Sequence, residues 1–283
     1  MTDTLQHANA GYARETLQPP SFATACLLVV RRNLIHIKRM PEMLMDVTVQ
    51  PVMFVLLFAF VFGASISVPG AASGYREFLV PGIMAQTMIF SSFYVAMGLV
   101  ADLEKGFVDR LKALPIHRSA ILVGRSMSSL IHSSIGITVM ALTGLTIGWR
   151  IRNGVLEGIL GFLLFLLMGF AMIWIGILVG SKFRSVEGVQ GFMFTVMFPL
   201  TFLANTFAPT ENMPDWLRFL AEWNPVSSLT QAARELWGNG PPAPPDAALP
   251  LHHPVLFTIG WAVLITAIVA PLSLRAFKAR SSD

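Results

Sequence analysis

The segment Gly176-Ile-Leu-Val-Gly180-Ser-Lys182 is the nearest approach in this sequence to a phosphate-binding loop. Such a loop requires the spacing G-x-x-x-x-G-K-[ST], which lets backbone N–H groups cradle phosphates while the lysine reaches them. The sequence lacks that spacing, so we expect no nucleotide site in this chain. The two glycines instead predict close packing between helices, as do Gly144 and Gly148.

Patterns typical of catalysis or metal binding are also missing from the sequence. It contains no H-E-x-x-H motif, no paired carboxylates at catalytic spacing and no G-x-S-x-G elbow. His252-His253 lies in a proline-rich stretch, where an exposed polar pair is favoured over a metal site. Cys26 is the single cysteine, so neither an intrachain disulfide nor a thiolate cluster can form. The sequence therefore predicts neither an enzyme nor a metal centre.

A charged segment at 101–118 has the most distinctive pattern. Its charges alternate in sign, at Glu104, Lys105, Asp109, Arg110 and Lys112. Its apolar residues are Phe107, Leu111 and Leu114. A solvated loop needs no apolar face, whereas a lever that docks into a groove on a partner protein does. We therefore interpret the segment as a docking element, in which Gly106 permits a bend or a close backbone approach.

The elements that position this segment must be membrane helices. Hydrophobic residues make up 54% of the 283 positions and charged residues 13%, with a mean hydropathy of +0.64. Soluble domains carry about 25% charged residues. Six stretches without Asp, Glu, Lys or Arg are long enough to cross a bilayer, which needs about 20 apolar residues. They are 47–68, 78–100, 126–148, 158–180, 188–208 and 255–274.

The third stretch is the weakest of these predicted spans because several serines and His132 dilute it. Without it, a five-span chain would place its termini on opposite sides. His132 is the only ionisable side chain well inside a predicted span, and such residues are functional candidates. The surrounding hydroxyls could satisfy its ring, so a structural role is favoured over a functional one.

The basic residues predict the orientation of the chain. With six spans, one side holds both termini and the segments 101–118 and 181–187, with 14 Lys and Arg residues. The other side holds 5, and Arg125 lies at the mouth of a span. Cytoplasmic loops carry the excess of Lys and Arg. We therefore expect both termini to be cytoplasmic.

Two further elements are expected outside the spans. The first 46 residues form a cytoplasmic tail and, between Phe22 and Met40, a moderately amphipathic helix on the membrane surface. The external segment 209–254 contains two helix starts, at Met213-Pro214 and at Asn224-Pro225, and a stop at Gly238. They predict a short re-entrant helical hairpin before the last span, followed by an extended proline-rich loop. The fold class is thus an all-α integral membrane protein.

In these segments the chain resembles the type-2 ABC exporter permeases, specifically the daunorubicin-resistance permease group of actinobacteria. The matching residues of the coupling segment are Glu104, Gly106, Asp109, Arg110, Leu111 and Pro115, followed by Gly124-Arg125. The external match comprises Phe202 to Pro209, Met213-Pro214, Trp216-Leu217, Asn224-Pro225 and Ala233-Arg234. Arg39, Pro41 and Pro51 match around the first span. The resemblance covers nearly the whole chain, and the loop 241–254 departs from it.

This resemblance implies one permease domain, 1–283, in the cytoplasmic membrane of a bacterium. It implies a dimer with an identical or sister permease and two separate ATPase subunits that bind the ATP and Mg, so that the chain itself needs no cofactor. Closure of the ATPase subunits would push on 101–118 and move an amphiphilic substrate outward. The implied substrates are anthracycline-like drugs or complex lipids, and no nucleic acid. The partners thus include membrane lipids.

Three alternatives remain. The exporter could carry a polymer or glycan, or the chain could be a membrane assembly protein that transports nothing. A membrane enzyme would need convergent polar residues inside the spans, and the sequence offers none. No proton-relay carboxylate lies in a predicted span, which argues against a proton-driven pump.

Overall fold

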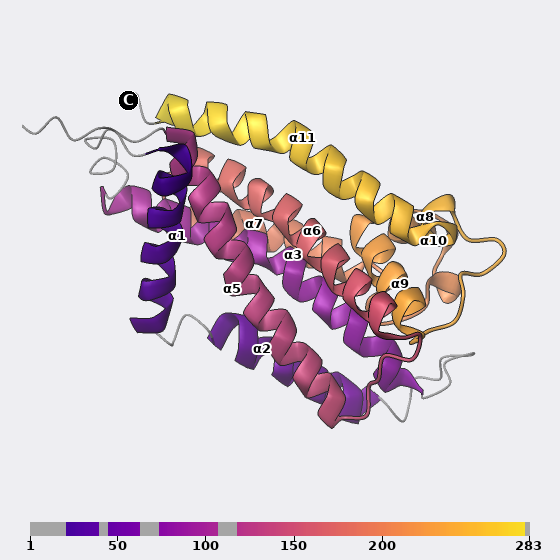
Figure 1. Ribbon diagram of the computed structural model, residues 1–283. Helices are drawn as coiled ribbons and strands as arrows, with labels where there is room; N and C mark the ends of the chain where they lie inside the picture. The colour runs from indigo at the N-terminus through magenta and orange to yellow at the C-terminus, as the bar shows by residue number, and fades with distance from the viewer. Residues whose placement is uncertain (1–20, 40–44, 63–73, 107–117, 281–283) are drawn as a thin grey trace, which may run out of the picture.

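The computed structural model describes residues 21–39, 45–62, 74–106 and 118–280 (Figure 1). Within these ranges the chain forms helices joined by turns and irregular segments, and no strand. The first half comprises α1 (Phe22–Arg39), α2 (Met45–Leu57), the π-helical η2 (Phe58–Phe62), α3 (Tyr75–Glu104) and α5 (Arg118–Thr146). The second half comprises α6 (Val155–Lys182), α7 (Val186–Phe202), η3 (Thr210–Asn212), α8 (Asp215–Glu222), α9 (Pro225–Trp237), α10 (Leu249–His252) and α11 (Pro254–Arg280).

Among the described residues, four helices are long and apolar enough to cross a membrane: α3, α5, α6 and α11. At a rise of about 1.5 Å per residue, their 27 to 30 residues exceed the roughly 30 Å of a bilayer core. They account for the predicted spans 78–100, 126–148, 158–180 and 255–274. The serine-rich third stretch therefore does form a long helix. The stretches 47–68 and 188–208 correspond to shorter apolar helices, α2 with η2 and α7.

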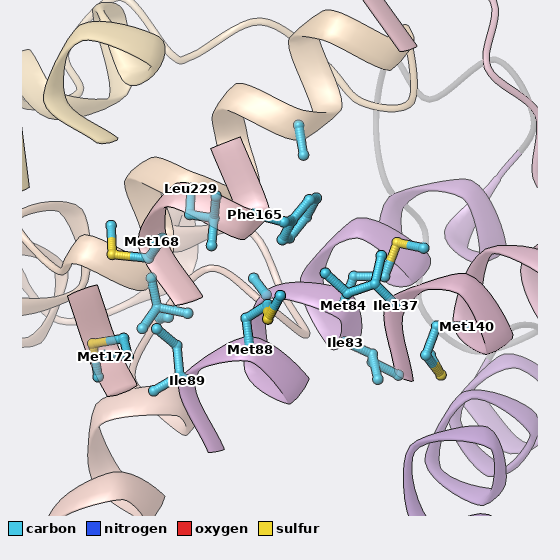
Figure 2. Close-up of a cluster of buried hydrophobic side chains, with 14 of the residues drawn as sticks. Ile83, Met84, Met88, Ile89, Ile137, Met140, Phe165, Met168, Met172 and Leu229 are labelled. Carbon is cyan, nitrogen blue, oxygen red and sulfur yellow. The ribbon is translucent and has the colours of Figure 1, made fainter. Parts of the chain in front are cut away.

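Helix α3 forms the centre of the bundle. Its most apolar 18-residue window is 78% buried, against 11% for the window of α11. Helices α2, α5, α6, α7 and α9 all pack against it. The buried side chains between them are mostly alanines, methionines and valines, with some isoleucine, leucine and phenylalanine, and Figure 2 shows part of this core. Those labelled in the close-up are Ile83, Met84, Met88, Ile89, Ile137, Met140, Phe165, Met168, Met172 and Leu229.

Glycines bring α6 into direct contact with the backbone of α3. A Cβ atom on Gly176 would lie 2.3 Å from the carbonyl oxygen of Ser92, and one on Gly180 would lie 2.8 Å from that of Ala96. The prediction of close helix packing at these two glycines is confirmed. For Gly148 it is wrong, because that residue has a φ of +102° and open space around it, so it serves the turn after α5 instead.

The short helices gather at the two ends of the bundle. Helix α1 lies across one end, beside the C-terminal end of α11 (Figure 1). Its Ala25 and Val29 are buried, whereas Leu27 and Leu28 are exposed. Helices α8, α9 and α10 occupy the opposite end (Figure 1), where α9 packs against α3 and α10 packs against α11. The two ends are therefore built from different segments of the chain.

We predict that Gly176→Val destabilises the bundle by about 1–3 kcal/mol, because the added side chain must push α6 away from the backbone of α3. The matched control is Gly260→Val on α11, where a Cβ meets nothing within 4 Å. Unfolding by SDS titration in detergent micelles measures both changes. Equal stability of the two variants would contradict the close α3–α6 contact.

Candidate functional site

The predicted coupling segment begins where α3 ends. Lys105 and Gly106 donate backbone N–H groups to the carbonyls of Ala101 and Leu103, which closes the last turn. Gly106 has a φ of +62°, and a Cβ atom there would meet nothing within 4 Å. The backbone thus turns at this glycine, and a close approach to a partner stays a prediction. Five other predicted residues lie outside the described part of the chain: Phe107, Asp109, Arg110, Leu111 and Pro115.

An ion pair joins the end of α3 to the start of α5. Arg125 donates to the carboxylate of Asp102 and packs against Gly98, where a Cβ would lie 2.8 Å from a guanidinium nitrogen. Arg32 of α1 also lies near this pair, and burial lowers the pKa of its guanidinium while Asp102 raises it. The sequence placed Arg125 at a span mouth without a partner. Asp102 and Arg125 are 23 positions apart in the sequence, and residues that far apart give no sequence pattern that would predict their contact.

Helix α1 is fastened to α5 beside this ion pair. Asn33 donates to the hydroxyl of Ser128 over 2.8 Å. A Cβ on Gly124 would lie 2.8 Å from Val29, so the glycine permits the contact between the two helices. These contacts therefore link three helices at the end of α3: α1, α3 and α5.

At the opposite end, α8 and α9 form the two predicted short helices of the hairpin. Asn224 caps α9 by accepting the backbone N–H of Val226 over 2.9 Å, and Pro225 occupies the first helical position. Gly238 ends the helix in the left-handed region with a φ of 68°. The start and the stop of α9 are as predicted. The other marker residues lie near the start of the hairpin: Pro209 before η3, Met213 after it, Pro214 before α8, and exposed Trp216 on α8.

A buried guanidinium links α9 to the centre of the bundle. Arg234 is 1% exposed, and its Nε and Nη2 donate to the carbonyls of Phe78 and Thr206 over 3.0 and 3.1 Å. Its Cζ also lies 3.3 Å from the centroid of the Phe78 ring. Burying a charge is costly unless such contacts compensate it. Arg234 therefore fixes the hairpin to the start of α3.

The turn between α5 and α6 also packs against the start of α3 and the end of α9. Glu77, buried at the start of α3, accepts a two-pronged bond from Arg152 over 3.1 and 2.7 Å, which raises the pKa of the arginine. The indole of Trp149 donates to Asn239 over 2.7 Å, and that of Trp237 donates to Gly158 over 3.1 Å. The two indole rings meet edge to face at 5.1 Å. Sequence reasoning treated Arg152 only as a topology marker and missed Glu77.

The proline-rich segment after α9 is ordered against α8. Arg218 donates to Glu222 and to Asp246 over 2.6 and 2.8 Å, and the latter bond lowers the pKa of Asp246. Glu222 also accepts the backbone N–H of Ala248 over 2.7 Å. The segment contains the short helix α10. The prediction of an extended loop after Gly238 is therefore wrong in part, because charged contacts with α8 fold it back.

Six phenylalanines form a continuous stack, called here the aromatic strip, along α7 and α2. Neighbouring rings lie 4.3 to 6.0 Å apart between centroids and 12° to 30° from parallel. In order of contact they are Phe194, Phe198, Phe202, Phe207, Phe58 and Phe54. Phe194 and Phe198 are exposed. The spacing of four residues along α7 was a signal that sequence reasoning did not use.

His132 lies half-buried on α5, away from both ends of the helix. Nearby hydroxyls of this helix bond to its own backbone: Ser128 donates to Arg125 and Ser134 to Ile131, over 2.8 and 2.7 Å. The role of His132 stays a prediction.

Together the fold and these sites define a multi-pass membrane protein whose helical bundle has an ion pair at one end and a network of buried hydrogen bonds at the other. The model of the ABC-2 type transporter family matches residues 24–236. The chain therefore belongs to the ABC-2 type transporter family.

Two relatives show which proteins this chain resembles in sequence. A daunorubicin resistance ABC transporter permease protein of Streptomyces coeruleorubidus is 29% identical over 259 residues, which are 92% of this chain and 88% of the relative. A probable doxorubicin resistance ABC transporter permease protein of Mycobacterium tuberculosis is 27% identical over 223 residues, 78% of this chain and 79% of the relative. The resemblance drawn from the sequence motifs is confirmed.

We predict that Arg234→Lys lowers the free energy of unfolding by about 1.5–3 kcal/mol, because an ammonium cannot reproduce the forked bonds to two carbonyls. The control is Arg76→Lys, since Arg76 is exposed and its guanidinium lies over the ring of Phe60, 4.9 Å from the ring centroid. SDS titration of the purified chain measures both. A loss no larger for Arg234→Lys than for Arg76→Lys would show that Arg234 does not anchor the hairpin.

Proposed function

We propose that this chain is the permease subunit of an ATP-driven ABC exporter that moves amphiphilic substrates outward across a bacterial cell membrane. The family match over residues 24–236 carries the proposal. Two relatives that cover most of the chain have names linked to resistance against daunorubicin and doxorubicin, which are planar, polycyclic and amphiphilic. ATP and Mg are bound by a separate ATPase subunit, present in two copies.

The proposed topology has six spans. Helix α7 has 17 residues, and α2 with η2 runs from Met45 to Phe62, so both fall within the range of lengths that cross a bilayer. Helix α1 and the end of α11 lie at the same end of the bundle, as an even number of crossings requires (Figure 1). The excess of Lys and Arg at this end favours the cytoplasmic side for both termini. Segment 209–254 is then external, with α8 and α9 re-entrant.

The segment 101–118 is the proposed contact with the ATPase subunit. Its first residues extend from the end of α3, the most enclosed helix of the bundle. The ion pair between Asp102 and Arg125 ties this point to α5, and Asn33 ties α5 to α1. A push on Glu104 would therefore reach the centre of the bundle along α3 and pass to α5 and α1 through these contacts.

The aromatic strip is the proposed substrate path. It belongs to α2 and α7, whose exposed apolar faces include Met53 and Phe194, 57% and 51% exposed. These exposed apolar faces are suited to packing against a second permease subunit, which is either an identical chain or a related one. In such a dimer the aromatic strip lies between the two subunits. Offset stacking on phenylalanine rings favours planar aromatic substrates.

We predict that Glu104→Ala and Gly106→Val lower export and substrate-stimulated ATP hydrolysis together, while membrane abundance stays normal. Valine is strained at a φ of +62°, whereas Gly106→Asn tolerates this conformation and should retain activity. Glu211→Ala, at the opposite end, is the control for charge. Export and ATPase activity are measured in vesicles that contain the permease and its ATPase.

Normal export by both Glu104→Ala and Gly106→Val would show that coupling occurs elsewhere. ATP hydrolysis by the permease alone would contradict the proposed division between subunits. An intact complex that exports nothing under any condition would favour an assembly protein instead.

We predict that Phe198→Ala raises the apparent KM for doxorubicin export roughly two- to tenfold, because one stacking contact contributes about 0.5–1.5 kcal/mol. Phe198→Tyr should retain wild-type affinity. Phe192→Ala is the matched control, since Phe192 is also exposed on α7 but stacks with Phe183 outside the strip. Equal effects of Phe198→Ala and Phe192→Ala would exclude the strip as a specific path.

A further inference from the structure

A basic pocket of about 560 Å³ lies where α6 and α11 end together. This volume is within the range of small-ligand sites, about 300–1,000 Å³. Its charged lining residues are Lys182, Arg184, Arg275 and Arg280. Leu178 and Leu272 are among the apolar residues of its walls. Basic residues at helix ends complement the helix dipole, but that role alone does not require a shared pocket with apolar walls.

The charges of the pocket differ in their roles. Arg280 donates to the carbonyls of Gly180 and Phe183 and so caps α6. Within the described ranges, no ion pair neutralises Lys182, Arg184 or Arg275, and all three are exposed. The positive charge therefore faces outward, where an anion can reach it.

The apolar walls continue onto the surface that faces lipid. Leu272 and Ile268 of α11 are 44% and 52% exposed, and they lead from the pocket along this helix. A phospholipid presents this same combination, an anionic phosphate attached to acyl chains. Basic pockets between transmembrane helices on the cytoplasmic side are known to suit anionic headgroups. A protein partner with an acidic surface would interact with the basic residues of the pocket, but it would not require the apolar wall that faces lipid. The combination therefore favours a phospholipid.

We propose that this pocket binds the headgroup of an anionic phospholipid. The phosphate lies among Lys182, Arg184 and Arg275, and one acyl chain follows Leu272 along α11. Glu104, at the start of the segment 101–118, interacts electrostatically with Arg280 of the pocket wall.

The test uses the purified full-length chain in detergent, with native mass spectrometry to count bound dioleoyl-phosphatidylglycerol. The variant Arg184→Gln/Arg275→Gln leaves Arg280 and its cap intact. The matched control, Arg76→Gln/Arg150→Gln, removes two exposed arginines from the opposite end. We expect roughly fivefold weaker binding for each removed pocket charge, thus about 25-fold for the pocket variant, and little change for the control.

Four outcomes would overturn the proposal. Equal binding of the lipid by both double variants would place it elsewhere. Equal binding of dioleoyl-phosphatidylcholine by the wild-type chain would show that the anionic charge is not recognised, and full competition by inorganic phosphate would indicate a site for free anions. A pocket variant that keeps the lipid but loses its ATPase in co-purification would assign these charges to the protein partner.

Discussion

Backbone contact between α3 and α6 is the constraint on which the rest of the bundle depends. In a bilayer, apolar side chains gain little by leaving lipid, so helices associate through close packing and polar contacts. Gly176 and Gly180 provide that closeness. The other faces of α6 contact α9 and α11. Gly161 of α6 leaves room for the indole of Trp237 on α9. The carbonyl of Trp174 on α6 accepts a hydrogen bond from Ser273 of α11 over 3.0 Å.

The two ends of this bundle are held in different ways. At one end, Arg234, Glu77 and two tryptophans are buried and bonded to neighbouring segments. At the other end, the ion pair of Asp102 with Arg125 and the hydrogen bond from Asn33 to Ser128 are among the contacts that join α1, α3 and α5. The first end is thus held mainly by buried side chains, and the second by partly buried ones.

Sequence reasoning predicted the helical architecture and the bounds of α9 because both depend on local signals. Apolar length defines a long membrane helix, and an asparagine cap with proline and a terminal glycine defines a short one. The same reasoning missed the pairs Asp102–Arg125 and Glu77–Arg152, because partners in separate helices leave no trace in local spacing. Gly148 was misassigned for a related reason: a glycine in a small-residue pattern serves packing or a turn, and only its surroundings decide which.

The partners of α3 also set the order in which the protein can mature. The start of this helix is held by Arg234, whose bond to Phe78 joins residues 156 positions apart in the chain. At a synthesis rate of about 5–20 residues per second, that interval lasts roughly 10–30 s. During this time the carbonyl of Phe78 lacks the guanidinium that later binds it, whereas Glu77 waits for Arg152, which is only 75 positions further along the chain. The nascent helix therefore enters the membrane with its polar end uncovered, and the bundle closes only after α9 has left the ribosome.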